Sequence, residues 1–131
     1  MRQLALPVLL LALSAPAGAR MYGADYEACS QQATAEIVEC VNASAKTWDR
    51  RMNGAYKALM QRSDAGQHEP LKAAQRRWVE YRDANCSFYA AGGGSLSPVA
   101  AAECLRAMTQ QRACELEAAN MPEGAAGQGC E

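Results

Sequence analysis

The chain has few of the residues that most often carry catalysis or bind metal ions. It contains one histidine, His68, and neither a G-x-S-x-G nor an H-E-x-x-H motif. It also lacks a C-x-x-C pair and any cluster of cysteine with histidine, so no zinc site is expected. His68 stands in a turn before Pro70, where a solvated or capping role is expected. These absences argue against an enzyme and predict neither a metal nor a cofactor.

The chain also lacks an apolar run long enough to cross a membrane. Its most apolar stretch, residues 4–13, is short and contains Pro7. This stretch follows Arg2 and precedes the small residues Ala17 and Ala19, an arrangement typical of a secretory signal. We therefore predict a signal peptide over residues 1–19, with no membrane insertion of the mature chain. The protein is expected to be periplasmic or secreted.

The charge of the chain is low. Loss of Arg2 with the signal peptide leaves 12 basic against 14 acidic residues, a net charge of −2. This charge and the export signal argue against a nucleic-acid partner. A mildly acidic surface is compatible with a cationic protein partner.

Three segments have the apolar period of helices, and none alternates as a strand does. The first runs from about Thr34, as N-cap, to about Arg62. The pair Asn53–Gly54 is a turn signal, but the apolar period keeps its phase across it, so one continuous helix is expected. The apolar stripe of this helix consists of Ile37, Val41, Ser44, Trp48, Met52, Ala55 and Leu59.

The second helix is expected to begin with Pro70 and to end at about Ala91. Its stripe consists of Leu71, Gln75, Trp78, Val79, Arg82 and Cys86. After a glycine-rich connection, Ser97 as N-cap and Pro98 as first residue open the third helix, and Pro122 ends it. The stripe of the third helix consists of Ala101, Leu105, Met108, Arg112, Leu116 and Ala119.

The sequence therefore predicts an all-α fold, a small three-helix disulfide-stapled bundle. It forms one domain over residues 20–131, with a core at about 29–118 and a flexible tail at 121–131.

Six cysteines in an exported small domain predict three disulfides. Cys86 ends the second helix and Cys104 lies early in the third, so antiparallel packing brings them together. Cys114 faces away from the Leu105 side of its helix, where only Cys130 on the tail can reach it. Cys29 and Cys40 remain, and the segment before Thr34 can fold back to join them.

Two arginines, Arg82 and Arg112, lie within apolar stripes, and Asp49 and Asp83 flank those stripes. Because an unpaired buried charge is costly, these four residues are expected to form a partly buried ion network that joins the helices. The alternative is that Arg82 or Asp49 is a ligand-binding or catalytic group.

The order of these residues resembles a known family. Cys40 is followed by "DRRMNGAY" (Asp49, Asn53, Tyr56) and by "QRRWVEYRDANC" (Gln75, Trp78, Tyr81, Arg82, Asp83, Cys86). A glycine-serine loop and "CLRAMTQQR" (Cys104, Thr109, Arg112) complete the pattern. Over residues 29–118 the chain resembles the LprI-like N-terminal domain family, which is named after a lysozyme-inhibiting lipoprotein. Met52 stands where the family has leucine, and Cys114 and Cys130 are additions to its usual four cysteines.

The resemblance implies an exported protein that binds and inhibits lysozyme or a related peptidoglycan hydrolase. The expected contact element is the glycine loop, Gly92, Gly93, Gly94, Ser95 and Leu96, or else the turn over residues 63–69. An immunity protein against an exported toxin is an alternative. A structural or assembly factor of the envelope that uses Tyr22, Tyr26 or Tyr89 is another.

Overall fold

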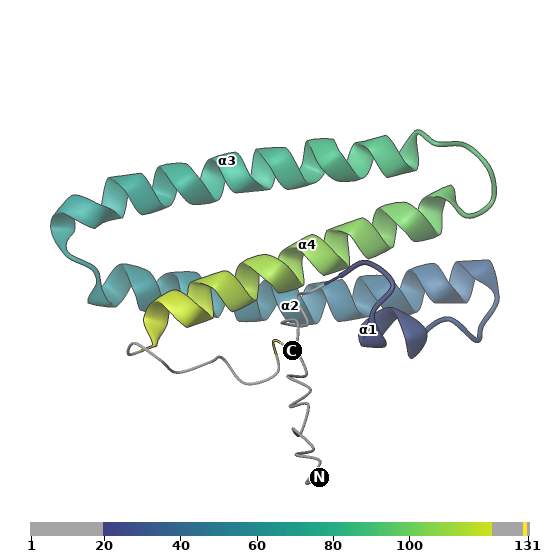
Figure 1. The fold of residues 1–131 in the computed structure, drawn as a ribbon, viewed down its shortest axis with the longest axis horizontal. Helices are drawn as coiled ribbons and strands as arrows, with labels where there is room; N and C mark the ends of the chain where they lie inside the picture. The colour runs from purple at the N-terminus through teal and green to yellow at the C-terminus, as the bar shows by residue number, and fades with distance from the viewer. Residues whose placement is uncertain (1–19, 122–129, 131) are drawn as a thin grey trace, which may run out of the picture.

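The computed structural model describes residues 20–121 and residue 130. These residues form the helices α1 (Ala24–Glu27), α2 (Thr34–Arg62), α3 (Ala65–Ala90) and α4 (Ser97–Asn120), and they contain no strand. The three long helices run antiparallel in chain order, and α4 lies between α2 and α3 (Figure 1). The all-α, disulfide-stapled bundle is confirmed, with the short α1 as an addition. The expected signal peptide and most of the expected tail lie outside the described residues.

The apolar stripe of α2 lies where its period predicts. Its buried residues are Ile37, Val41, Trp48, Met52 and Ala55. The helix continues without a break through Asn53–Gly54. It begins one residue earlier than expected, because the N–H of Ala33 donates to Glu36 Oε2 (3.3 Å) and Thr34 is already helical.

The starts of α3 and α4 also differ from expectation. α3 begins at Ala65, because the N–H of Asp64 donates to Gln67 Oε1 (3.0 Å) and so fixes the first turn. Pro70 therefore lies inside the helix, near its N-terminus, where its missing N–H costs one intrahelical bond. At α4 the N-cap is Leu96, and Ser97 Oγ donates instead to the carbonyl oxygen of Tyr89 (2.7 Å).

The most buried face of α4 is not the one that its apolar spacing predicts. Of the expected stripe only Leu116 is buried; most of that stripe faces α3, where Met108 Sδ accepts from Asn85 Nδ2 (3.3 Å). α4 packs more extensively against α2, through a face of small residues and one ion pair. The buried residues of the helix are Val99, Ala102, Glu103, Cys104, Arg106, Ala107, Thr109, Ala113 and Leu116. Because this face contains the charged residues Glu103 and Arg106, its sequence resembles that of a solvent-exposed helix face.

Three disulfides join the expected cysteine pairs. Cys29–Cys40 ties the segment after α1 to α2, Cys86–Cys104 ties α3 to α4, and Cys114–Cys130 ties residue 130 to α4. The expected orientation of Cys114 is wrong, because its side chain is half-buried and packs against the cluster formed by Trp48 and Leu116. The reason is again that the buried face of α4 differs from the face that its apolar spacing predicts.

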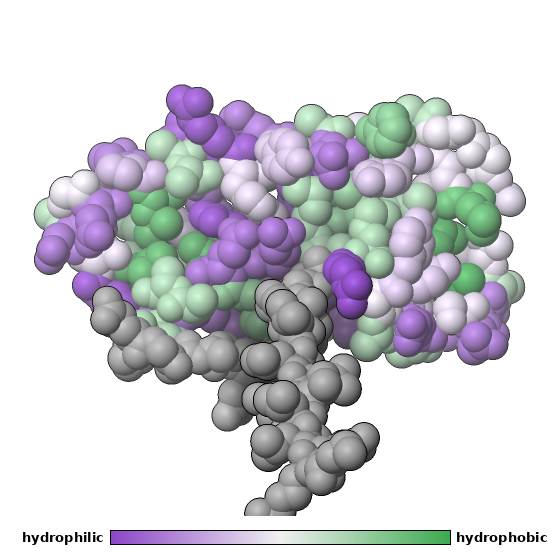
Figure 2. Space-filling model, in the orientation of Figure 1, coloured by the Kyte–Doolittle hydropathy of each residue, from purple (hydrophilic) through white to green (hydrophobic). Residues whose placement is uncertain are grey.

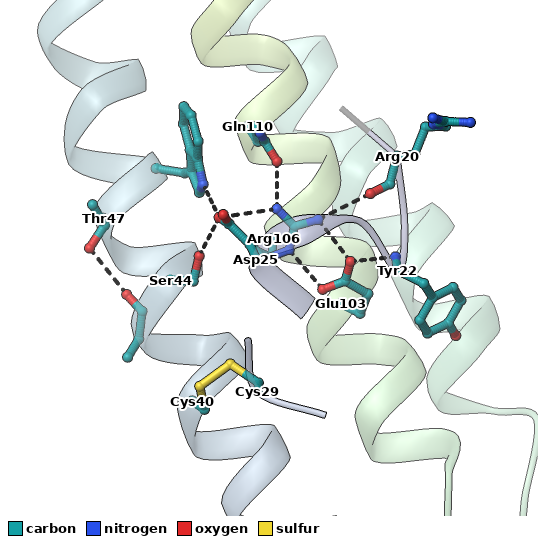
Figure 3. A network of polar contacts seen from close by, with 12 residues as sticks. Arg20, Tyr22, Asp25, Cys29, Cys40, Ser44, Thr47, Glu103, Arg106 and Gln110 are labelled. Carbon is teal, nitrogen blue, oxygen red and sulfur yellow. Dashed lines mark hydrogen bonds and ion pairs between the residues drawn. A yellow bond between two sulfur atoms is a disulfide. The ribbon is translucent and has the colours of Figure 1, made fainter. Parts of the chain in front are cut away.

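The buried ionic group of Glu103 and Arg106, drawn in Figure 3, belongs to the core beside two apolar clusters. One of these clusters lies around Val41 and the other around Trp48. Arg106 and Glu103 are 1% and 0% exposed. Glu103 accepts from Arg106 Nε (2.7 Å) and Nη2 (2.8 Å). Arg106 Nη1 also donates to Asp25 Oδ2 (3.4 Å) and to Gln110 Oε1, and Nη2 donates to the carbonyl oxygen of Arg20 (3.1 Å). All five N–H groups of this guanidinium thus have a partner.

The same group holds the N-terminal segment and α1 against the helices. The N–H of Tyr22 donates to Glu103 Oε1 (2.7 Å), in a backbone conformation with φ of +62°. On α1, Asp25 Oδ2 accepts from Ser44 Oγ and from Trp48 Nε1, both at 2.7 Å. α1, α2 and α4 therefore share one hydrogen-bond network.

Arg106→Met is expected to lower the free energy of unfolding by roughly 3–5 kcal/mol, because it leaves Glu103 buried without its cation. Arg112→Met is the matched control. Arg112 pairs with Glu115, whose side chain is 48% exposed, and donates one hydrogen bond to Gln75 on α3, so its loss is expected to cost about 1–2 kcal/mol. Guanidinium chloride unfolding with the disulfides intact measures both values. Equal losses in the two variants would contradict a special role for the buried pair.

Asp25 gives the fold a dependence on acid pH. Partial burial raises the pKa of Asp25, but the hydrogen bonds from Trp48 and Ser44, with the nearby Arg106, outweigh it and hold that pKa below its ordinary 3.8. A carboxylate with a lowered pKa stabilises the folded state fully above pH 3.8, and this contribution is lost as the pH falls through the folded pKa. The difference in melting temperature between wild type and Asp25→Asn is therefore expected to be constant from pH 5 to pH 7 and to shrink below pH 4. A difference that does not change with pH would contradict this assignment.

Candidate functional site: the α3–α4 loop and the adjoining groove

The connection between α3 and α4 is a tight, well-fixed loop. Gly93 and Gly94 have φ of +72° and +83°, a region that side chains with a Cβ rarely adopt. Ser97 Oγ bonds the carbonyl oxygens of Tyr89 and Ala90 at the end of α3 (2.7 and 2.8 Å). Near the loop, the Cys86–Cys104 disulfide joins α3 to α4. The loop expected to bind a partner therefore has a defined shape before any partner arrives.

Large hydrophobic side chains are exposed at this end of the molecule. Phe88 is 74% exposed and Leu96 is 66% exposed, one on each side of the glycines. Tyr22, which is 49% exposed, lies near Tyr89; partial burial and then nearby Tyr26, Glu103 and Tyr89 raise its pKa. Figure 2 shows hydrophobic surface over the C-terminal end of α3 and the loop. We refer to Phe88, the loop residues 92–96 and Tyr22 as the loop surface.

The second expected contact element is not a loop in the structure. Because α3 begins at Ala65, the turn expected over residues 63–69 is reduced to Ser63 and Asp64. His68 lies in the first turns of α3, with Nε2 at 3.1 Å from the carbonyl oxygen of Ser63. This region caps two helices and offers no projecting element.

The four residues of the expected ion network form separate local contacts. Arg82 pairs with Asp83 on its own helix (Nη2 to Oδ1, 2.8 Å) and lies over the ring of Trp78. Arg112 pairs with Glu115 (3.0 Å), and Arg112 Nε also donates to Gln75 on α3. Asp49 accepts from Asn53 Nδ2 (3.0 Å). Within residues 20–121 no ion pair joins these three contacts, and the buried network lies instead at Glu103 and Arg106.

Asp49 and Arg82 lie on opposite sides of an open groove. The groove has a volume of about 470 Å³ between α2 and α3, with α4 as its floor. Its lining residues are Asn42, Ala45, Lys46, Asp49, Arg50, Arg82, Leu105 and Thr109. A second hollow of about 240 Å³ shares Leu105 and follows the seam between α3 and α4 as far as Ala90, at the start of the loop. We refer to the two hollows together as the seam groove.

The described residues hold neither a free thiol nor a cluster of side chains typical of a metal site. Their six cysteines are all in disulfides, so none is a thiol. In this part of the chain no three His, Cys, Asp or Glu side chains come together as a metal site would require. None of the helices within residues 20–121 combines the length and low polarity that a membrane crossing needs. Within these residues the loop surface and the seam groove are candidate binding features; a further hollow of about 560 Å³ lies between α2 and the C-terminal end of α4.

Comparison with known proteins gives a family and one relative. The sequence model of a family described as "Lysozyme inhibitor LprI" matches residues 25–116. An uncharacterized protein of Rhizobium meliloti (strain 1021), R02472, is 34% identical over 124 residues, which cover 83% of this chain and 88% of the relative. No solved structure matches the chain.

The loop conformation itself can be tested. Gly94→Ala is expected to lower the free energy of unfolding by about 1–2 kcal/mol, because its φ of +83° is strained for a residue with a Cβ. Ser95→Ala, at the next position, serves as the control and is expected to change stability by less than about 0.5 kcal/mol. Chemical denaturation of the oxidised protein measures both. If Gly94→Ala is as stable as Ser95→Ala, the loop does not hold the conformation described.

Proposed function

Because this chain belongs to the LprI family of lysozyme inhibitors, we propose that it binds a lysozyme-type peptidoglycan hydrolase and blocks its substrate cleft with the loop surface. Such hydrolases act through two carboxyl groups that flank the scissile bond in an open cleft. An element that projects and keeps its shape can enter a cleft of this kind. The glycine loop is such an element.

The observation that carries the proposal is the exposure of Phe88 and Leu96 beside a loop that is already fixed. Isolated exposed apolar side chains are ordinary, but two of this size flanking one turn offer an apolar surface that a partner can cover. The Cys86–Cys104 disulfide and the bonds of Ser97 hold the loop. Binding therefore orders little of the inhibitor, which favours affinity.

The proposed inhibitor acts by binding alone, without turnover. The disulfides occupy every cysteine of the described residues, and His68 contacts a backbone carbonyl at a helix junction. We further propose that residues 1–19 are removed on export and that residues 20–131 act in the periplasm or outside the cell. The hydrolase is the proposed partner, and no cofactor takes part.

Titration of the purified oxidised protein against c-, g- and i-type lysozymes tests the proposal. We expect stoichiometric inhibition of at least one class. Phe88→Ser and Leu96→Ser are each expected to raise the inhibition constant roughly tenfold or more, as loss of a contact anchor does. Tyr81→Ser is the matched control, since Tyr81 is 62% exposed on α3 but lies two turns before Phe88.

Circular dichroism of each variant verifies that its fold is intact. If inhibition survives both loop-surface substitutions, the contact lies elsewhere on the molecule. If no lysozyme of the panel is inhibited by the wild-type protein, the proposed function is wrong, whereas the fold described above still stands.

A further inference from the structure

We propose that the seam groove is a second binding site, which takes an extended peptide segment carrying a carboxylate side chain next to an apolar residue. The site adjoins the loop surface but shares no residue with it, and it does not require the partner to be a hydrolase. Its evidence is the charge of one end of the groove, the apolar character of the other end, and the shape of the seam between them.

The cationic end of the groove has more positive charge than its own carboxylates neutralise. Lys46 forms no ion pair within residues 20–121, and Arg50 Nη2 donates only to the neutral hydroxyl of Thr47 (3.0 Å). Arg82 directs Nε and Nη2 to Asp83, so its Nη1 has no partner among these residues. Three cations therefore line or rim a concave surface in which a carboxylate would find several charge-assisted donors.

Asp49 gives this end its preference for a peptide over a free anion. Its carboxylate lines the same hollow as Arg82 but accepts only from the amide of Asn53. It would repel a bare anion, whereas it can accept a hydrogen bond from a backbone N–H. The hydroxyl of Thr109, on the floor, is a further polar partner. A peptide segment with an acidic side chain can pair with the cations of the groove through its carboxylate and with Asp49 through its backbone N–H groups.

The other end of the groove suits an apolar side chain. Beyond Leu105, the seam is lined by Cys86, Ala90 and Ala101, whose small side chains leave the hollow of about 240 Å³. Asp83, already paired with Arg82, stands at the junction of the two ends. From residue 83 to residue 90 a helix rises by roughly 10 Å, the length of about three extended residues. The groove therefore matches a short segment in which the apolar residue and the carboxylate are neighbours.

Two capped peptides test this site directly. Acetyl-Ala-Leu-Glu-Ala-amide and its Gln counterpart differ only in the carboxylate, and each is titrated into the ¹⁵N-labelled oxidised protein. The Glu peptide is expected to shift the amide signals of Ala45, Leu105 and Thr109 in a saturable way, and to bind roughly tenfold more tightly than the Gln peptide.

Lys46→Gln and Arg82→Gln are each expected to remove most of this preference. Lys46→Gln changes an exposed side chain without an ion-pair partner, so its fold is expected to be unaffected. Arg77→Gln is the matched control, since Arg77 is an exposed cation of α3 that does not line the groove.

Equal affinity for the two peptides overturns the proposal, and so does saturable binding that maps away from the groove. An equal loss of preference in Arg77→Gln would reduce the effect to net charge and would also overturn it. Acetate that binds as tightly as the Glu peptide would show an anion site and exclude the peptide segment. None of these results depends on lysozyme inhibition, so this proposal and the proposed function fail independently.

Discussion

The fold depends on the burial of one guanidinium group. Arg106 lies in the interior at 1% exposure, with a fully buried carboxylate beside it. A buried ion pair is tolerable only when its remaining donors and acceptors are also satisfied. Here the partners come from α4 itself, from Asp25 on α1 and from the backbone of the N-terminal segment. The N-terminal segment therefore completes the set of partners for Arg106, which explains why residues outside the long helices belong to the core.

The buried ionic group of Glu103 and Arg106 determines how the rest of the core is built. It interrupts the contact between α2 and α4, so the apolar residues fall into two small clusters around Val41 and Trp48. Small clusters bury little apolar surface, and a chain of this size has few others to add. The three disulfides compensate for this, because each lowers the conformational entropy of the unfolded chain and so stabilises the folded state. The Cys29 disulfide fixes the cluster around Val41, and the Cys114 disulfide lies against the cluster around Trp48.

Sequence reasoning succeeds here where one physical signal outweighs the others, as the apolar period of α2 outweighs the turn signal at Asn53–Gly54. The period of α2 is uninterrupted, so its buried stripe and its passage through Gly54 are predictable. It fails where signals compete. Glu103 and Arg106, three residues apart on a helix, have the spacing of a solvated ion pair, and only the tertiary fold buries them. Pro70 is a strong start signal, but the capping of Asp64 by Gln67 starts the helix earlier. The seam groove arises from three helices together, so no single stripe reveals it.

The buried residues are distributed unequally among the helices, and this distribution affects the two binding surfaces. α2 and α4 carry nearly all of the buried residues, whereas Cys86 is the one buried residue of α3. Phe88 of the loop surface and one wall of the seam groove nevertheless belong to α3. The buried faces of α2 and α4 therefore carry most of the core, whereas recognition rests on outer positions of α2 and α3, and the Cys86–Cys104 disulfide connects α3 to α4. Because few buried contacts constrain the outer positions of α3, substitutions there change the binding surfaces at little cost in folding free energy. The fold can accordingly keep one buried network while its surface adapts to different partners.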